Sequence, residues 1–298
     1  MLSRLGLGTV QFGLEYGISN RAGHPGEREV ANILARAIEA GIGYLDTAPA
    51  YGDAEALVGR NLPEGHRLRI VTKTPAIANA TIEARQGRLV LDSLAASLDR
   101  MRVNNVHGFL VHQMRDLAKP GWQHLVEAMT EARSRGWASH IGASIYSSDQ
   151  LALLESRFAP EIVQLPLNVL DRRALVSGVL AHLKAGGVEI HARSVFLQGL
   201  LLMNPGELPD FFIPIRDDIV AMQRCWAEQG WSAIAVCLAF ALQQAEIDAV
   251  IVGVNREKEF DEIANMARQS GNIRDCGAAP TVDPVYLDPS RWPAFRHQ

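Results

Sequence analysis

The stretch GIGYLDTAPAYG, residues 41–52, passes from a glycine through a short apolar run to an acid and a tyrosine. The segment before it, REVANILARAIEAG at residues 28–41, has apolar residues at helical spacing and ends at glycine, as helices commonly do. The run GYLD at 43–46 reads as a buried strand that ends at Asp46, and Tyr51 follows it in the next loop. This stretch therefore predicts a helix, a strand and a loop that carries polar side chains.

The same alternation of strand and helix continues along nearly the whole chain. Short apolar runs read as eight strands, at residues 5–9, 43–46, 69–73, 107–112, 139–144, 161–165, 188–194 and 248–253. Longer amphipathic segments lie between them, at residues 28–41, 54–62, 83–101, 122–136, 148–158, 172–186, 215–244 (a pair of helices) and 256–269. When strands alternate with helices, successive strands usually pair in parallel through right-handed crossover connections. Eight such strand–helix units suit a closed barrel. We therefore expect an α/β protein with a (β/α)8 TIM barrel, in a single domain over residues 1–298.

An open doubly wound sheet is the competing architecture. It is disfavoured because no GxGxxG turn follows an early strand and no linker rich in proline, glycine and serine divides the chain. The barrel is expected over about residues 4–268. Residues 270–298 are rich in proline and lack a period, which predicts an extended C-terminal tail on the barrel surface. Tyr286, Trp292 and Phe295 would anchor this tail by packing, and the alternative is that they close the substrate mouth.

The composition is that of a folded protein without a polyanionic partner. Hydrophobic residues make up 48% of the 298 residues and charged ones 21%, and the formal net charge of −4 argues against nucleic-acid binding. Cys225, Cys237 and Cys276 show no paired CxxC spacing, which favours reduced thiols in the cytoplasm over disulfides or a zinc site. No apolar segment is long enough to span a bilayer, so the sequence predicts no membrane insertion or export and leaves the oligomeric state open.

Polar side chains gather at the predicted carboxyl ends of the strands, where the active sites of such barrels lie. These ends carry Asp46 with Tyr51, then Lys73, then His112. Each alone has an ordinary interpretation, such as a helix cap, a loop anchor, a solvated amine or a core histidine. Together, an acid, a phenol, an amine and an imidazole on one rim form a set for proton transfer. The opposite strand ends begin with unremarkable Gly, Arg, His, Ser or Glu.

The chemistry of this set is protonation of a carbonyl oxygen. A free tyrosine has a pKa near 10, and a nearby ammonium is expected to lower the pKa of Tyr51. Asp46 would hold Lys73 charged in a desolvated pocket, and His112 would orient the carbonyl oxygen or help to move its proton. None of these four residues donates a hydride, so the sequence predicts a bound cofactor that does.

Six segments in this order resemble the aldo-keto reductases, over essentially residues 4–268. They are YLDTAPAYGDAEALVG, VTKTP, LVHQ, IGAS, HARSVFLQGLL and VIVGVNREKEFDEI. The resemblance implies a (β/α)8 barrel that binds NADPH across its top and reduces a carbonyl compound. It implies that Tyr51 is the general acid, that Lys73 and Asp46 tune it, and that His112 places the substrate carbonyl. No metal ligand is predicted among these residues.

The resemblance also implies a set of cofactor-binding residues. Ser144 and Gln164 would hold the nicotinamide carboxamide and so fix which face of the ring meets the substrate. Ser194, Val195 and Gln198 would line the pyrophosphate, with Gly8 and Thr9 under the ribose. The last segment contributes Gly253, Asn255, Arg256, Glu259 and Glu262.

Three positions depart from the pattern of many family members. Ile145 stands where an asparagine often contacts the carboxamide. Arg193 stands where an aromatic ring often stacks on the nicotinamide, and its planar guanidinium can also stack there but adds positive charge beside the ring. Glu259 stands where an arginine often binds the 2′-phosphate of NADPH, and its carboxylate would repel that phosphate. Arg256 lies close by and keeps NADPH ahead, with NADH possible.

The loop at residues 10–26 is long for its position and is expected to set substrate preference, with Phe12, Tyr16 and His24 at the active-site rim. The predicted substrate is an aldehyde, ketone or sugar-like carbonyl compound. Two other functions stay open at this point. One is an aldolase in which Lys73 forms a Schiff base, and the other is a nucleotide-binding regulatory barrel with little turnover.

Overall fold

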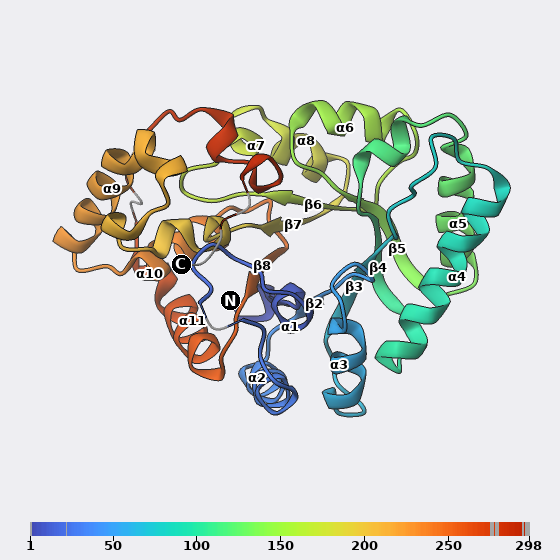
Figure 1. Cartoon of the computed structure of the whole chain (residues 1–298), viewed down its shortest axis with the longest axis horizontal. Coiled ribbons are helices and arrows are strands. Elements are labelled where there is room, and N and C mark those ends of the chain that lie inside the picture. The colour runs from blue at the N-terminus through green and yellow to red at the C-terminus, as the bar shows by residue number, and fades with distance from the viewer. Residues whose placement is uncertain (1, 22, 275–276, 278–279, 294, 296–298) are drawn as a thin grey trace.

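Eight parallel strands close into a barrel in the computed structural model, which describes residues 2–21, 23–274, 277, 280–293 and 295 (Figure 1). The strands are β1 (Leu5–Gly8), β2 (Tyr44–Asp46), β3 (Arg69–Lys73), β4 (Val106–Val111), β5 (Ala138–Ser144), β6 (Ile162–Pro166), β7 (Glu189–Arg193) and β8 (Ala249–Gly253). Each strand pairs with the next along the chain, and β1 also pairs with β8 to close the ring. The predicted (β/α)8 barrel is confirmed.

Helices surround the barrel (Figure 1). They are α1 (Val10–Gly13), α2 (Glu27–Ala40), α3 (Ala54–Asn61), α4 (Ala84–Met101), α5 (Gln123–Ser134), α6 (Ser148–Glu155), α7 (Arg173–Val176), α8 (Val179–Ala185), α9 (Arg216–Glu228), α10 (Ala233–Leu242) and α11 (Glu257–Gln269). In α2 the buried residues are Val30, Ile33, Leu34 and Ala37, which recur at helical spacing. Gly41 ends this helix with a φ of 74°, and its N–H bonds back to carbonyls of the last turn.

Short 3-10 turns complete the described secondary structure. They are η1 (Leu2–Arg4), η2 (Met114–Ala118), η3 (Leu197–Leu202), η4 (Pro205–Glu207), η5 (Asp210–Ile215), η6 (Ser270–Asn272), η7 (Pro284–Tyr286) and η8 (Pro289–Arg291). Three of them, η3 to η5, follow one another in the long connection between β7 and α9. This connection and the β1–α2 connection supply much of the wall of the cavity described below.

Two predicted segments differ from the structure. The segment 172–186, expected as one helix, is split into α7 and α8, because Gly178 between them has a φ of 76° and breaks the helical path. The segment 10–26, expected as a loop, begins with the one-turn helix α1. Phe12 in that turn is completely buried in the main core, and His24 is exposed; only Tyr16 of the three expected rim residues lines the cavity.

Two apolar layers of side chains lie in the barrel directly below its carboxyl end. Two small buried clusters stand apart from the large core that joins sheet and helices, and they consist of Tyr44, Ala249 and Ile251, and of Val71, Leu110 and Ile162. Side chains two apart on a strand share a face, so Asp46 lies on the same side of β2 as Tyr44, and Lys73 on the same side of β3 as Val71. The alternation therefore places a charged pair directly above an apolar floor.

The C-terminal tail packs on the connection that follows β7. The rings of Tyr286, Trp292 and Phe295 lie against Phe212 in η5, with ring centroids 6.3, 4.8 and 5.5 Å from that of Phe212. All three residues pack against the main core, as expected for anchors. None of the three lines the cavity. Cys276, expected as a thiol of the tail, lies outside the described residues.

Among the described residues, no single helix is long and apolar enough to cross a membrane. The segment Asp210–Glu228 and α10 are together long and apolar enough to span a bilayer, but a bend of 92° separates them. All α10 residues from Ala235 to Leu242 are buried.

Candidate active site

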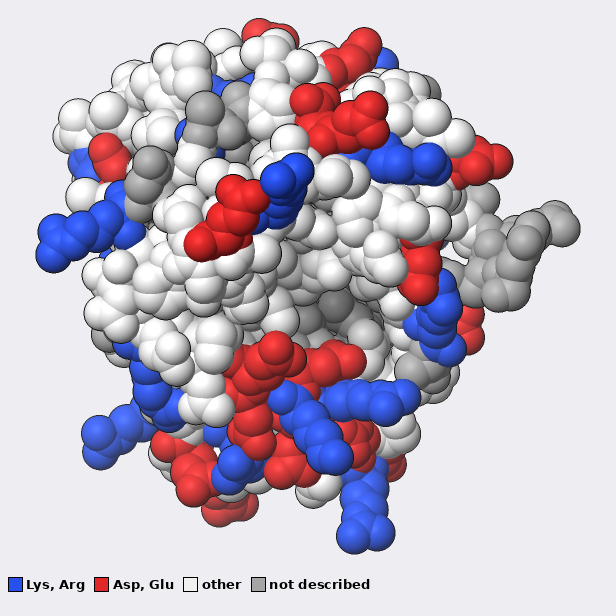
Figure 2. Space-filling model, turned by 90° about the vertical axis from the view of Figure 1, so that its left-hand side faces the viewer, with Lys and Arg blue, Asp and Glu red and all other residues white. Residues whose placement is uncertain are grey.

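A cavity of about 620 Å³ opens at the carboxyl ends of the strands. Figure 2 views the molecule from this side and shows a hollow near its centre, with acidic and basic side chains along the lower edge. Every residue that the sequence analysis assigned to catalysis or to the cofactor lines this cavity. The structure therefore brings together side chains that lie as far apart along the chain as Gly8 and Glu262.

A buried ion pair lies at the bottom of the cavity. The ammonium of Lys73 donates to both carboxylate oxygens of Asp46 at 2.8 Å and to the carbonyl of Thr47 at 2.9 Å. The side chains of Lys73 and Asp46 are only 1% and 8% exposed. Desolvation lowers the pKa of Lys73, while the charge and hydrogen bonds of Asp46 oppose that shift. All three ammonium hydrogens have partners, as a buried amine requires.

Tyr51 and His112 lie beside this ion pair. The Lys73 Nζ is 5.1 Å from the centre of the Tyr51 ring, and the His112 ring meets the Tyr51 ring edge-on with centroids 5.8 Å apart. Burial and the nearby Lys73 charge lower the pKa of His112 to about 4, so its imidazole is neutral near pH 7. The phenol thus has a cation on one side and a neutral imidazole on the other.

The expectation that Lys73 lowers the pKa of Tyr51 is wrong for the ligand-free protein. Burial raises the pKa of Tyr51 well above 10, the Asp46 charge adds to the shift, and Arg193 opposes it only in part. The reason is that the charge of Lys73 is already neutralised by Asp46, with which it shares two hydrogen bonds. The phenol is therefore protonated throughout the neutral range.

A chain of hydrogen bonds extends from the ion pair across the cavity. The Gln164 amide donates to Asp46 Oδ1 at 2.7 Å and accepts from the Ser144 hydroxyl at 3.4 Å. Arg193 Nε donates in turn to the Ser144 hydroxyl at 3.3 Å. Residues from β2, β3, β5, β6 and β7 are thus joined in one network that begins at Lys73 and ends at Arg193.

Arg193 is held as a second cation of the cavity. Its guanidinium donates to the carbonyl of Ile145 at 3.1 Å and to the Ser194 hydroxyl at 3.2 Å. Its Cζ lies 4.0 Å above the centre of the Tyr146 ring, in cation–π geometry. The sequence analysis expected Arg193 to stack on a nicotinamide and did not assign Tyr146 to the site. The available signal was an aromatic residue two positions after Ser144, just past the end of β5.

The loop that follows β7 has a strained backbone. Ser194, Leu197 and Gln198 have φ values of 59°, 48° and 55°, a left-handed conformation that non-glycine residues seldom adopt. The buried side chain of Asn168 helps to hold this loop by donating to the Ser194 carbonyl at 3.0 Å. Strain of this kind persists only where surrounding contacts enforce it, and it is common in loops that bind ligands.

The β1–α2 connection lies against this strained loop. The N–H of Ile18 donates to the Gln198 carbonyl at 3.1 Å, and the Gln198 amide donates to the Tyr16 hydroxyl at 3.3 Å. Burial raises the pKa of Tyr16 to about 12. Gln11, from the same connection, also lines the cavity, and its Oε1 is buried without a partner among the described residues. The sequence analysis did not identify Gln11, because it lies within α1 rather than at a strand end.

The far end of the cavity is formed by the start of α11. The carboxylate of Glu259 accepts from the N–H of Asn255 at 2.8 Å, so it caps the turn before the helix. The Asn255 amide oxygen also accepts a long hydrogen bond of 3.4 Å from Asn20. Arg256 lines the cavity, and the structure gives its guanidinium no ion pair with any described residue.

Comparisons with known proteins agree with this geometry. The family model described as "Aldo/keto reductase family" matches residues 4–272. The chain is 25% identical over 206 residues to the Aldo-keto reductase YhdN of Bacillus subtilis; this match covers 67% of the chain but 60% of the relative, less than two thirds of its length. It is 26% identical over 285 residues to the L-glyceraldehyde 3-phosphate reductase of Escherichia coli O157:H7, with 84% and 82% covered.

A solved structure supports the fold. The glycerol dehydrogenase of Gluconobacter oxydans superposes with a TM-score of 0.70 over 95% of this chain and 94% of that one, at 19% identity. This likeness concerns the barrel alone, because the identity is low. The family match covers nearly the whole chain, and the barrel that it implies is the one observed. The chain belongs to the aldo/keto reductase family.

Proposed function

We propose that this protein reduces a small carbonyl compound to an alcohol with a reduced nicotinamide dinucleotide, and that Tyr51 is the general acid. The observation that carries the proposal is the convergence of Asp46, Tyr51, Lys73 and His112 in one cavity. Family membership supports the same reaction class. The dinucleotide would supply the hydride, and the four residues would supply and control the proton.

The surroundings of Tyr51 and His112 suit the transfer of that proton. As negative charge develops on the carbonyl oxygen, the phenol of Tyr51 donates its proton to that oxygen. The neutral imidazole of His112 donates a hydrogen bond to the same oxygen and so sets the angle of approach. The positive charge of Arg193, which partly opposes the rise in the pKa of Tyr51, would stabilise the phenolate that remains, while Lys73 lies 5.1 Å from the ring centre and is held there by Asp46. Each group is thus in the protonation state that its role requires before the substrate binds.

Several features of the cavity fit a dinucleotide. Ser144 and Gln164 are already fixed by hydrogen bonds and face the position proposed for the carboxamide. The buried Oε1 of Gln11 has no partner among the described residues and would accept a hydrogen bond from a bound dinucleotide. The left-handed residues between Ser194 and Gln198 form a loop of the type that presents backbone N–H groups to phosphate oxygens. The Gln11 side chain lies against Gly253 in the cavity wall. A Cβ at position 253 would lie only 2.2 Å from the Gln11 amide, so glycine is needed there for Gln11 to keep this position.

The charges at α11 favour NADPH over NADH. Glu259 is engaged with the N–H of Asn255, which draws its carboxylate into the helix cap. Arg256 faces the same end of the cavity and is available to pair with a 2′-phosphate. The carboxylate of Glu259 still lies nearby, and this lowers the expected discrimination between the two cofactors.

We propose a small, sugar-like aldehyde as the substrate class. Tyr16, Tyr146 and Arg193 place hydroxyl and guanidinium groups around the mouth of the cavity, and such groups bind hydroxylated compounds by hydrogen bonds. The Escherichia coli relative, whose name specifies L-glyceraldehyde 3-phosphate, is consistent with this class. The aldolase alternative is less favoured, because all three hydrogens of the Lys73 ammonium are bound by Asp46 and Thr47 and a Schiff base would break that pair.

Replacing the proposed acid tests the assignment directly. Tyr51→Phe removes the proton donor but keeps the ring against His112, so kcat for reduction of a carbonyl panel should fall by about 10²- to 10⁴-fold. Fluorescence titration with NADPH should give an unchanged Kd. Tyr286→Phe, a ring of the tail outside the cavity, is the matched control and should retain full turnover. Retention of activity in Tyr51→Phe would remove Tyr51 as the acid. A wild type that binds NADPH but reduces nothing would favour the regulatory barrel.

The pH profile of reduction follows from the two groups at the carbonyl. Tyr51 must carry its proton, and its pKa lies above 10; His112 must be neutral, and its pKa is about 4. The value of kcat/KM is therefore expected to stay level from about pH 6 to about pH 9, to fall at lower pH as His112 gains a proton, and to fall at higher pH as Tyr51 loses one. Initial rates of nicotinamide absorbance loss would give this profile. A decline centred near pH 7 would contradict the assignment.

Cofactor preference should depend on Arg256. Arg256→Ala removes the proposed partner of the 2′-phosphate, so KM for NADPH should rise by about tenfold, equivalent to about 1.4 kcal/mol, while KM for NADH stays constant. Arg268→Ala, near the other end of α11, controls for loss of a helix charge. Equal effects of Arg256→Ala on both cofactors would show that Arg256 does not contact the 2′-phosphate.

A further inference from the structure

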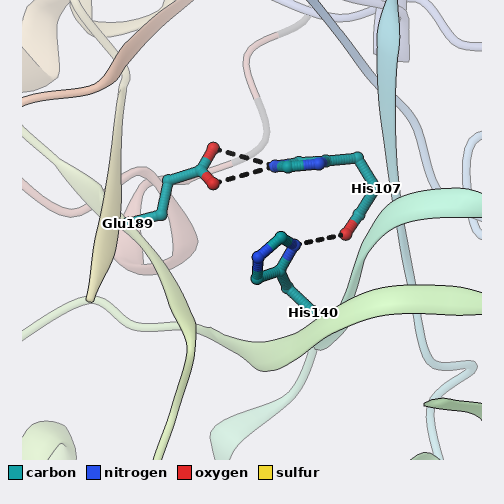
Figure 3. Close-up of side chains that lie close together, drawn as sticks. All are labelled: His107, His140 and Glu189. Atoms are coloured by element: carbon teal, nitrogen blue, oxygen red, sulfur yellow. Dashed lines mark hydrogen bonds and ion pairs between the residues drawn. The ribbon is translucent and has the colours of Figure 1, made fainter. Parts of the chain in front are cut away.

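A cluster of two histidines and a glutamate lies at the end of the barrel opposite the proposed active site. His107, His140 and Glu189 lie near the amino-terminal ends of β4, β5 and β7. Figure 3 shows that their side chains converge although the residues are up to 82 positions apart. None of them lines the active-site cavity, so the cluster has no part in the function proposed above.

The spacing of the cluster suits coordination of one metal ion. One ligand atom from each residue lies within 4.8 Å of the others. His107 Nε2 is 3.0 and 2.8 Å from the two carboxylate oxygens of Glu189. Ligand atoms about 2.0–2.2 Å from a zinc ion are a little more than 3 Å apart, so small shifts would open space for the ion.

The tautomer of His140 is fixed in the form that a metal ligand needs. Its Nδ1 lies 3.1 Å from the carbonyl oxygen of His107, and a carbonyl only accepts, so this nitrogen carries the proton. The Nε2 of His140 is then a lone-pair donor. Histidines that bind metals typically have their second nitrogen bonded to a carbonyl or carboxylate in this way.

The glutamate is oriented by a further histidine. His191 Nε2 is 2.8 Å from Glu189 Oε1, and the His191 side chain is completely buried. The Nδ1 of His191 has no partner in the described structure, so the proton is expected on Nε2, which donates to the carboxylate. Glu189 is thus bonded by two imidazoles, with Oε1 toward His191 and Oε2 directed at His107.

Cations near the cluster are largely neutralised by other groups. A cavity of about 600 Å³ gives access to His140 and Glu189. Of the basic residues in its wall, Arg133 pairs with Glu161 at 2.6 Å and Lys184 pairs with Asp248 at 2.7 Å. The Arg69 guanidinium lies 3.8 Å over the ring of Tyr44. Two of the three Lys and Arg side chains in this wall are therefore paired with carboxylates other than Glu189.

We propose that His107, His140 and Glu189 bind one divalent transition-metal ion of the zinc type at the base of the barrel. Two imidazole nitrogens and one carboxylate oxygen are a ligand set that zinc accepts, with water in the fourth position. Binding replaces the proton on His107 Nε2 by the metal, and His107 takes up a proton on Nδ1 instead, so that it binds as a neutral imidazole with no net change in bound protons. The ion links β4 to β7, two strands that do not pair with each other.

Calorimetric titration of the whole, chelator-treated protein with ZnCl2 tests the proposal. The wild type should bind one equivalent with a Kd of about 1 μM or below. His140→Gln and Glu189→Gln should each weaken this binding by at least about 100-fold. His182→Gln is the matched control, because His182 is an exposed histidine that also bonds a glutamate, at 2.7 Å.

Two further measurements keep the outcome clear if a variant is poorly folded. Far-UV circular dichroism and the Kd for NADPH should match the wild type in every variant used. Co²⁺ as a probe should give the visible bands of a four- or five-coordinate nitrogen and oxygen site in wild type and His182→Gln, and lose them in His140→Gln. Zinc binding that is absent from the wild type, or equal in all variants, would overturn the proposal.

Discussion

The candidate site depends on the buried ion pair between Asp46 and Lys73. Both side chains are almost fully removed from solvent above an apolar floor, where an isolated charge would be costly. Losing one partner of such a pair costs about 3–5 kcal/mol, because the other charge is left uncompensated. Asp46 ends β2 and Lys73 ends β3, so the pair forms only when these neighbouring strands are in register. The fold and the site are therefore coupled at this point.

The hydrogen bonding and protonation of other polar groups in the cavity depend in part on this pair. Gln164 donates to Asp46 and orients Ser144, which receives a further hydrogen bond from Arg193. Tyr51 keeps its proton because burial and the Asp46 charge raise its pKa, and the Lys73 charge that could oppose them is already balanced by Asp46. His112 stays neutral because burial and Lys73 disfavour a second positive charge. The ligand-free protein thus holds an acid ready to donate and an imidazole ready to orient a carbonyl group.

The sequence predicted the architecture and the polar rim well, for physical reasons. Buried parallel strands are nearly continuous apolar runs, so their limits in the chain are visible, and their carboxyl ends must meet on one face of a closed barrel. The convergence of Asp46, Lys73 and His112 follows from that geometry alone. The stack of Arg193 on Tyr146 does not, because it depends on the path of a loop and on side-chain rotamers that no periodicity encodes.

Two further features were hidden from sequence reasoning. The raised pKa of Tyr51 depends first on the burial of its side chain and then on the nearby charge of Asp46, and the depth of burial of a loop residue cannot be read from residue type. The cluster at the base of the barrel consists of His and Glu residues near the starts of three strands, and each of these residues looks ordinary in the sequence. It becomes visible only when β4, β5 and β7 place His107, His140 and Glu189 together.

The central claim is that Asp46 and Lys73 act on Tyr51 as one unit. Single-turnover rates of hydride transfer, followed by nicotinamide absorbance in stopped flow, should be compared for Asp46→Asn, Lys73→Met and the double variant. If the two residues form one unit, the double variant should be about as slow as the slower single variant, because the first change already removes the pair. Rate losses that multiply, as expected for independent residues, would contradict the account.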